Sequence, residues 1–293
     1  MLKKFRTLYT DKLYVKVITV ILVVLTAMGV MLPMVLLASL LGVDLKKNGG
    51  INLNVDSANI FLFFLFVTCS SSIIWLAQKY IHQKSFLDLG FKTKIFKFLL
   101  IGFLVGVLKS AAGFGLMIYN AEFVEYIETI PPDVSFWSYL LYYIYFIFGF
   151  LICNSFVEEL VTRAYPIEKL SKHINPHIIF IAMGAIFTIG HFITREFDFG
   201  YCLSLFVFSY TFSLLYYYSR SIWLVIGMHT GINWVGFSFF GSNWKLGALV
   251  HIQMSNVPEW IVSYSQAFFG LIVLLIVVLM NKKGYFKTIN HIE

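Results

Sequence analysis

The sequence predicts an all-α integral membrane protein, a polytopic helical bundle of about eight transmembrane helices with both termini in the cytoplasm. The first observation is composition: of 293 residues, 59% are hydrophobic and only 13% are charged, whereas soluble domains carry about 25% charged residues. The second is a series of long, continuously apolar runs, and the third is an uneven distribution of Lys and Arg between the connecting loops. This composition excludes a disordered chain, a disulfide-stapled secreted fold and a soluble nucleic-acid-binding protein.

The apolar runs define the helices. A transmembrane helix needs about 20 mostly apolar residues. Eight stretches meet this condition: 15–42, 58–78, 96–118, 136–157, 177–194, 199–218, 221–240 and 260–280. The runs are continuously apolar rather than alternating, which excludes a transmembrane β-barrel. Pro33 is expected to kink the first helix. No internal repeat or linker is evident, so residues 1–293 are expected to form one integral-membrane domain.

Lys and Arg residues give the orientation, because cytoplasmic loops carry an excess of them. With the N-terminus inside, seventeen fall on the inside: Lys3, Lys4, Arg6, Lys12, Lys16, Lys79, Lys84, Lys92, Lys94, Lys97, Arg163, Lys169, Lys172, Arg220, Lys282, Lys283 and Lys287. Four fall outside: Lys46, Lys47, Arg195 and Lys245. This bias predicts cytoplasmic termini. The composition, rich in Phe, Ile, Lys and Asn, leads us to expect a bacterial plasma membrane.

The three cysteines, Cys69, Cys153 and Cys202, lie in apolar runs. Thiols in such surroundings behave as small hydrophobic groups. Neither a disulfide framework nor a cysteine-based metal site is expected.

Ionisable side chains inside apolar helices are the functional candidates, because they are costly in a bilayer. Thirteen of the fifteen acidic residues fall in termini or predicted loops, and the two exceptions are the adjacent Glu158 and Glu159. Two of the seven histidines, His191 and His229, also lie within apolar runs, as does Lys109. Carboxylates and imidazoles of this kind can activate a water molecule.

Helical spacing groups these residues further. Glu159 and Arg163 are four residues apart and can form an ion pair on one helix face. Glu158 is rotated by about 100° from Glu159, which leaves its carboxylate to face elsewhere.

The two histidines also have neighbours at helical spacing. Phe187 lies four residues before His191, so its ring can wall the imidazole. His229 and Asn233 have the same spacing, and together they could chelate a metal or donate hydrogen bonds to an oxyanion.

In these motifs the sequence resembles the CAAX-protease and bacteriocin-processing (CPBP, or Abi) family of intramembrane proteases. The family is marked by Glu-Glu-x-x-x-Arg, Phe-x-x-x-His and His-x-x-x-Asn on successive helices. Here these read EELVTR at 158–163, FTIGH at 187–191 and HTGIN at 229–233. The resemblance covers residues 136–240, which would be the catalytic core.

The resemblance implies an endopeptidase acting on a membrane-associated peptide or protein. Some members cut prenylated C-terminal Cys-a-a-X sequences, and bacterial relatives are linked to bacteriocin or pheromone processing and self-immunity. In the mechanism that fits the residues, Glu158 is the general base and His191 helps to hold the water. His229 and Asn233 would stabilise the oxyanion, while the Glu159–Arg163 pair fixes the helix. No cofactor is favoured.

A zinc mechanism is the alternative, in which Glu158, His191 and His229 hold the metal and a water takes the fourth position. Metal analysis of the purified protein would decide between the two mechanisms.

Straight helices would place Glu158 near one membrane face and His191 about 20 Å higher. We expect that the fourth helix instead extends through about residue 172, which would place Glu158 inside the bilayer. Lys109 is expected to pair or to snorkel within the membrane; a more specific hypothesis is contact with a substrate carboxylate or a lipid head group.

Two other functions use the same features. A non-catalytic immunity or scaffold protein could bind a peptide or a sensor kinase, and a transporter could use intramembrane Glu and His for proton relay. A transporter would be expected to show inverted repeats and paired broken helices, which are not evident here. The expected partners are the peptide substrate and the lipid bilayer, with no nucleic acid, and the oligomeric state is left open.

Overall fold

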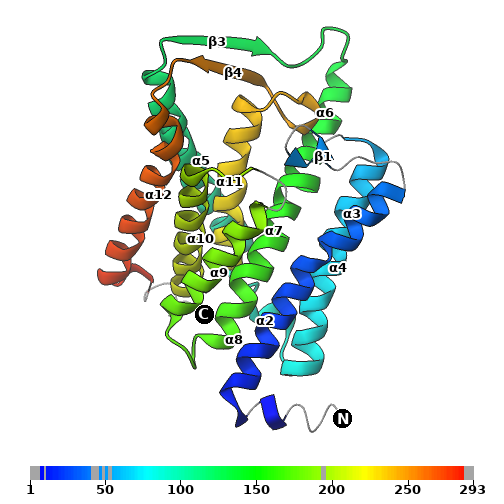
Figure 1. Cartoon of the computed structure of the whole chain (residues 1–293), viewed down its shortest axis with the longest axis vertical. Helices are drawn as coiled ribbons and strands as arrows, with labels where there is room; N and C mark the ends of the chain where they lie inside the picture. The colour runs from blue at the N-terminus through cyan, green and yellow to red at the C-terminus, as the bar shows by residue number, and fades with distance from the viewer. Residues whose placement is uncertain are drawn as a thin grey trace. The chain divides into compact units, whose positions relative to one another are not determined.

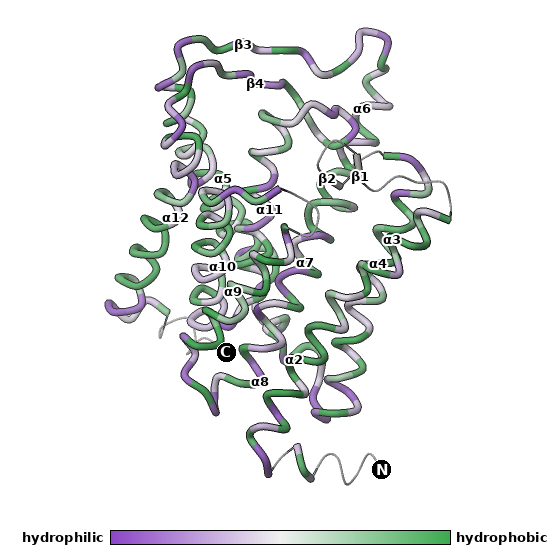
Figure 2. The backbone as a smooth tube through the Cα atoms, in the orientation of Figure 1, coloured by the Kyte–Doolittle hydropathy of each residue, from purple (hydrophilic) through white to green (hydrophobic). Residues whose placement is uncertain are grey.

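The computed structural model describes residues 7–9, 11–40, 46–47, 50–51, 55–192 and 196–286, and within them the chain is almost entirely helical (Figure 1). The polytopic helical bundle predicted from the sequence is confirmed. Seven helices within the described residues are long and apolar enough to cross a membrane: Leu13–Leu40, Ser57–His82, Ile95–Tyr119, Phe136–Leu170, Phe199–Ser219, Ile222–Phe240 and Glu259–Lys282. Figure 2 shows their apolar middles and the polar residues at many of their ends.

The fifth predicted helix, expected over 177–194, is shorter than the others. Helix α9, Pro176–His191, has 16 residues and therefore rises about 24 Å, slightly less than the roughly 30 Å hydrocarbon core. Pro176 occupies its first turn, where no N–H is needed, and the side chain of Asn175 caps it by accepting from the N–H of His177. These two residues explain why α9 starts where it does.

The first membrane helix is interrupted. It consists of α2, Leu13–Gly29, and α3, Met31–Leu40, with the break at Val30. Pro33 explains the break, because its ring lacks an N–H and clashes with the carbonyl four residues earlier, that of Gly29. The helix is thus interrupted one turn before the proline, while the kink predicted in it stays a prediction.

The fourth membrane helix is longer than its apolar run suggests. It is built from α6 (Phe136–Ile144), a π-helical segment (Tyr145–Leu151), α7 (Ile152–Glu159), a second π-helical segment (Leu160–Ala164) and α8 (Tyr165–Leu170). The predicted extension of this helix is confirmed. Glu158 lies about 33 Å along the helix from Phe136, and about 18 Å of helix follow it.

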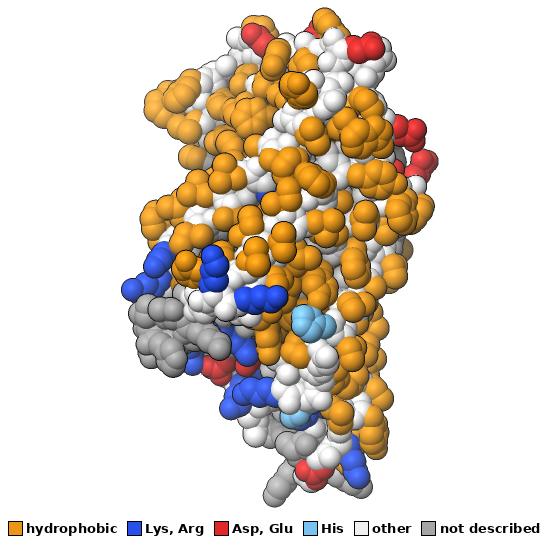
Figure 3. Space-filling view, turned by 90° about the vertical axis from the view of Figure 1, so that its left-hand side faces the viewer, with side chains coloured by type: hydrophobic (Ala, Val, Ile, Leu, Met, Phe, Trp, Pro, Cys, Tyr) orange, Lys and Arg blue, Asp and Glu red, His pale blue; other side chains and the backbone are white. Residues whose placement is uncertain are grey.

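The other membrane helices are α4 (Ser57–Leu76, continued by a π-helical segment Ala77–His82), α5 (Ile95–Tyr119), α10 (Phe199–Ser219), α11 (Ile222–Phe240) and α12 (Glu259–Lys282). Short 3-10 turns at Phe86–Asp88 and Trp244–Leu246 lie in connections. Hydrophobic side chains cover most of the face seen in Figure 3, and Lys and Arg gather in its lower half. Leu36 and Leu108, for example, are 69% and 70% exposed, as expected for side chains that face lipid.

The chain divides into two compact units. One contains residues 1–93 and 157–196, and the other contains residues 94–156 and 197–293. The long helix Phe136–Leu170 runs from the second unit into the first.

Two short antiparallel sheets join loops. β1 (Lys46–Lys47) pairs with β2 (Gly50–Ile51), and β3 (Phe123–Glu128) pairs with β4 (Val250–Ser255). The second sheet, in which Glu125 lies opposite Gln253, was not expected from the sequence, where both segments were read as loops.

The β3–β4 pairing constrains the membrane topology. Paired strands lie on one side of the membrane, so the chain between them must cross an even number of times. If the helix Phe136–Leu170, α10 and α11, which are long and apolar enough to cross a membrane, provide three crossings, α9 would supply the fourth. This supports the eight-helix topology, and a small local thinning of the bilayer can accommodate the short helix.

Helices α5 and α11 pack backbone to backbone. Gly102 and Gly106 on α5 face the carbonyl oxygens of Leu224 and Met228, and an added Cβ at either glycine would overlap them. The contact is reciprocal, because Gly227 and Gly231 on α11 would overlap the carbonyl oxygens of Leu99 and Phe103. Small residues four apart allow this close approach in membrane helices.

Candidate active site

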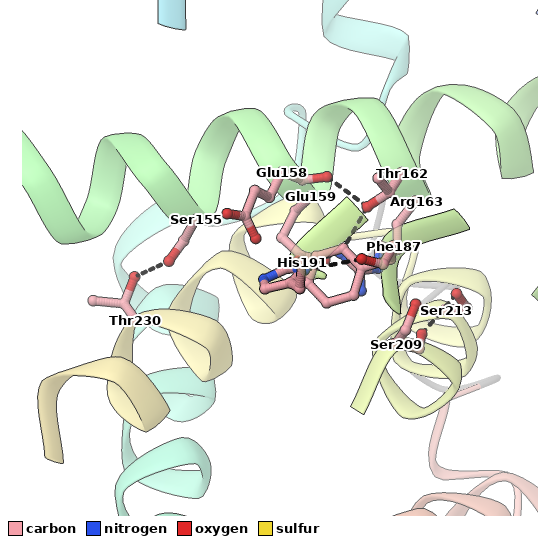
Figure 4. A network of polar contacts seen from close by, with 10 residues as sticks. All are labelled: Ser155, Glu158, Glu159, Thr162, Arg163, Phe187, His191, Ser209, Ser213 and Thr230. Atoms are coloured by element: carbon pink, nitrogen blue, oxygen red, sulfur yellow. Dashed lines mark hydrogen bonds and ion pairs between the residues drawn. The ribbon is translucent and has the colours of Figure 1, made fainter. Parts of the chain in front are cut away.

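A buried ion pair lies at the centre of the first sequence motif. Glu159 ends α7, and Arg163 lies in the π-helical segment that follows. Their Oε1 and Nη1 atoms are 3.0 Å apart and both side chains are fully buried. Arg163 also donates to the hydroxyl of Thr162 over 2.6 Å (Figure 4). The pairing predicted from the four-residue spacing is therefore present.

Phe187 connects the first motif to the second. Its ring lies 4.2 Å below the guanidinium carbon of Arg163, a cation–π distance. The same ring is 4.5 Å from the imidazole of His191, centroid to centroid. Phe187 is 6% exposed, and its ring contacts both the ion pair and the histidine.

The hydrogen bond of His191 fixes its tautomer. Nδ1 lies 2.9 Å from the backbone carbonyl oxygen of Phe187. A carbonyl can only accept, so Nδ1 carries the hydrogen and Nε2 of the neutral ring has a free lone pair. His191 is only partly buried, so this Nε2 can accept a hydrogen bond from water or coordinate a metal.

Glu158 differs from its neighbour Glu159 in burial. Its side chain is half-buried, whereas that of Glu159 is fully buried. The hydroxyl of Thr162 donates to the backbone carbonyl of Glu158 over 2.6 Å. In Figure 4 the Glu158 carboxylate projects from its helix on the side where the His191 ring lies. Glu158 is therefore the more accessible of the two carboxylates.

The third motif lies on α11, in the other unit. His229 is 8% exposed, and its ring centroid is 5.7 Å from that of Phe212 on α10. Asn233 is half-buried. Gly227 and Gly231 are each two residues, about 200°, from His229. The glycine face that packs on α5 is thus nearly opposite the face that carries His229 and Asn233.

Two further hydrogen bonds fix this helix. The hydroxyl of Thr230 donates to that of Ser155 on α7 over 3.2 Å. The indole N–H of Trp234 donates to the Tyr143 hydroxyl over 2.9 Å. The sequence reasoning overlooked Ser155, Thr230 and Thr162, because Ser and Thr in apolar helices usually bond only to their own helix.

The structure brings together Glu158, Glu159, Arg163, Phe187 and His191 in one unit, and His229 with Asn233 in the other. The expected convergence of these two groups on one water stays a prediction.

Lys109 is buried, with 3% of its surface exposed. Its Nζ donates to Oε1 of Gln266 on α12 over 2.7 Å and lies 3.5 Å from the centre of the Phe208 ring. Within the described residues it has no carboxylate partner. This environment favours the predicted structural pairing, while contact with substrate or lipid stays a prediction.

No group of three or more His, Cys, Asp and Glu side chains in the described part of the chain could hold a metal ion. The expected zinc ligands Glu158, His191 and His229 are divided between the two units, so the zinc hypothesis is not tested. The His191 hydrogen bond would fit a metal ligand, because metal-bound histidines commonly donate their other N–H to a carbonyl.

The fold and these motifs define a polytopic membrane protein with a polar cluster in its apolar helices. Residues 139–235 match the family model described as Type II CAAX prenyl endopeptidase Rce1-like. The matched segment is about a third of the chain and contains all three motifs, so the resemblance to the CPBP family is confirmed there. No curated protein and no solved structure matches the chain.

Proposed function

We propose that this protein is an intramembrane endopeptidase that hydrolyses a peptide bond of a membrane-associated peptide or protein. The observation that carries the proposal is the arrangement of Glu158 and His191 beside the buried Glu159–Arg163 pair, within the segment that matches the CAAX prenyl endopeptidase family. The fully buried ion pair supports the helix, and the adjacent residue Glu158 is only partly buried.

In the proposed reaction Glu158 accepts a proton from water while the water oxygen attacks the scissile carbonyl carbon. The other O–H of the water donates a hydrogen bond to Nε2 of His191, which orients the water. This role is in keeping with the tautomer of His191. His229 and Asn233 donate hydrogen bonds to the tetrahedral oxyanion, each worth roughly 3 kcal/mol. The C–N bond then breaks, and the proton on Glu158 passes to the leaving amine.

The zinc alternative assigns Glu158, His191 and His229 as ligands, with the metal supplying Lewis-acid activation of the water and carbonyl. Metal analysis of purified protein distinguishes the two mechanisms. Stoichiometric zinc that is lost together with activity on chelation would replace the metal-free proposal.

The decisive experiment compares Glu158→Gln with Glu159→Gln in purified, full-length protein. Candidate peptides, both with and without a prenylated Cys-a-a-X terminus, are incubated with each variant, and products are read by mass spectrometry. We expect Glu158→Gln to lower kcat by at least 100-fold and to lower thermal stability less than Glu159→Gln does, because Arg163 keeps its ion-pair partner.

The matched variant should behave differently. Glu159→Gln removes the partner of the buried Arg163 and should lower thermal stability. Cleavage by Glu158→Gln at the wild-type rate would overturn the proposed base. An unchanged cellular phenotype in the double variant Glu158→Gln, His191→Ala would favour the non-catalytic immunity or scaffold function.

A further inference from the structure

Two basic groups meet where the first and fourth membrane helices end. Lys16 lies in the first turn of α2, and His173 follows α8. Lys16 Nζ and His173 Nε2 are 2.8 Å apart. Both groups belong to the same unit, and within the described residues neither has a carboxylate partner. A neutral imidazole accepts this bond from the Lys16 ammonium.

Further cations lie beside this contact. Lys12 is one helical turn before Lys16, and Lys172 precedes His173 in the chain. Burial lowers the pKa of His173, and the charges of Lys16 and Lys172 lower it further. Groups that repel one another's charge in this way are stabilised when an anion binds among them.

An apolar surface adjoins the cations. The start of α2 lines a shallow groove of about 570 Å³ with Asp11, Lys12, Leu13, Tyr14, Val17 and Ile18. Leu13 is 48% exposed and Ile18 is 53% exposed, as expected for apolar side chains on a membrane helix. Among the described residues that line the groove, Asp11 is acidic and Lys12 is basic.

We propose that Lys12, Lys16 and His173 bind the phosphate of an anionic phospholipid whose acyl chain lies along Leu13, Val17 and Ile18. Two observations favour a lipid over a free anion. The cations lie in and just before the first turn of a membrane helix, which is the level of lipid head groups, and the adjoining groove is apolar. The inference does not depend on the proposed protease activity.

The test uses full-length protein in detergent, titrated with phosphatidylglycerol or with phosphatidylcholine of the same chain length and followed by native mass spectrometry. Wild-type protein should prefer phosphatidylglycerol. Lys16→Gln should weaken phosphatidylglycerol binding roughly fivefold, since a juxtamembrane Lys contributes about that factor, and Lys16→Arg should retain it.

Lys92→Gln is the matched control, because it removes one charge from the same unit at a Lys that pairs with Asp88. Equal phosphatidylglycerol affinity in Lys16→Gln and Lys92→Gln would overturn the proposal. Melting temperatures of the variants show whether each is folded.

A second measurement separates a lipid from a free anion. In ¹⁵N-histidine-labelled protein, short-chain phosphatidylglycerol should raise the pKa of His173, because a nearby anion favours the charged imidazole. Inorganic phosphate should have little effect at the same concentration. An equal rise with phosphate alone would replace the lipid site with a general anion site.

Discussion

In the motif Glu-Glu-x-x-x-Arg, Glu159 and Arg163 form an ion pair that supports the structure. Both side chains are fully buried, so each charge depends on the other and on neighbours such as the Thr162 hydroxyl and the Phe187 ring. Breaking a buried pair leaves one uncompensated charge, whereas removing both partners leaves none. The effect of a substitution on stability therefore distinguishes the structural carboxylate, that of Glu159, from that of Glu158.

A double-mutant cycle tests this assignment. Glu159→Ala and Arg163→Ala should each destabilise the protein by about 3–5 kcal/mol. The double variant should be less destabilised than the sum of the two, because no lone buried charge remains. Thermal unfolding in a fixed detergent measures the three variants. Additive single effects would show that the pair contributes no coupling energy.

The tautomer of His191 is a second prediction at this scale. The Phe187 carbonyl requires the hydrogen on Nδ1, so above the pKa of the ring ¹⁵N spectra should show protonated Nδ1 and unprotonated Nε2. His191→Asn assigns the signal by removing it. A ring protonated at Nε2 would contradict both the hydrogen bond and the proposed water-accepting role.

Much of the candidate site could be predicted at the residue scale, because its pairs are local. Glu159 with Arg163 and Phe187 with His191 are each four residues apart, and helical periodicity alone brings such residues together. The cation–π contact between Arg163 and Phe187 depends on how two helices pack. The Ser155–Thr230 bond joins residues 75 positions apart. The spacing of residues along the sequence predicts neither the Arg163–Phe187 contact nor the Ser155–Thr230 hydrogen bond.

At the scale of elements, the sequence predicted the helices better than their interruptions. The helix extension beyond residue 157 followed from the need to place Glu158 within the membrane. The two π-helical segments in the same helix share no sequence pattern, because one is YFIFGFL, without a charged residue, and the other, LVTRA, contains Thr162 and Arg163. The glycine pairs on α5 and α11 have the spacing Gly-x-x-x-Gly, a known signal for close packing of membrane helices, which the sequence reasoning did not use.

The α5–α11 crossing predicts an effect on activity. A methyl group at Gly231 would overlap the carbonyl oxygen of Phe103, which forces α11 away from α5. His229 and Asn233 lie on the opposite face of α11 and would be displaced together with the helix, in the direction away from α5. Gly231→Ala should therefore cost about 1–3 kcal/mol of stability and lower kcat by roughly tenfold or more, since a 1 Å displacement can cost 100-fold.

Gly236→Ala is the control for this prediction. Gly236 lies on the same helix, but a Cβ there would contact nothing within 4 Å. It should leave kcat and thermal stability near wild type. Equal activity of the Gly231→Ala and Gly236→Ala proteins would show that the crossing does not set the position of His229 and Asn233.

At the scale of the whole molecule, the β3–β4 sheet is what the sequence reasoning missed. Strand β4 alternates apolar and polar residues, VHIQMS at 250–255, and this period of two is the signal of a strand, whereas β3, FVEYIE at 123–128, does not alternate. The signal in β4 was overlooked because strands were not sought between membrane helices. Their pairing also depends on the path of four intervening helices, which no local pattern reveals.

A cysteine pair tests the register of this sheet. In a background without Cys69, Cys153 and Cys202, Glu125→Cys with Gln253→Cys should form a disulfide under mild oxidation, because the two residues are directly opposed. Glu125→Cys with Ile252→Cys should not, since the side chains of neighbouring residues in a strand point to opposite faces. Equal cross-linking of both pairs would contradict the register.

The same sheet leads to a test of topology. Between Lys172 and Gln253 the chain contains α9, α10 and α11; three crossings place these residues on opposite sides of the membrane, whereas two would place them on one side. Single cysteines at 172 and 253, labelled in intact cells with a membrane-impermeant maleimide, distinguish the cases.

We expect position 253 to be labelled in intact cells and position 172 only after permeabilisation, because the Lys and Arg distribution predicts that residue 172 is cytoplasmic. Labelling of position 172 alone in intact cells would mean that α9 crosses the membrane but that the chain has the opposite orientation. Labelling of both positions would mean that α9 does not cross, and β3 could then not pair with β4 in a membrane-embedded protein.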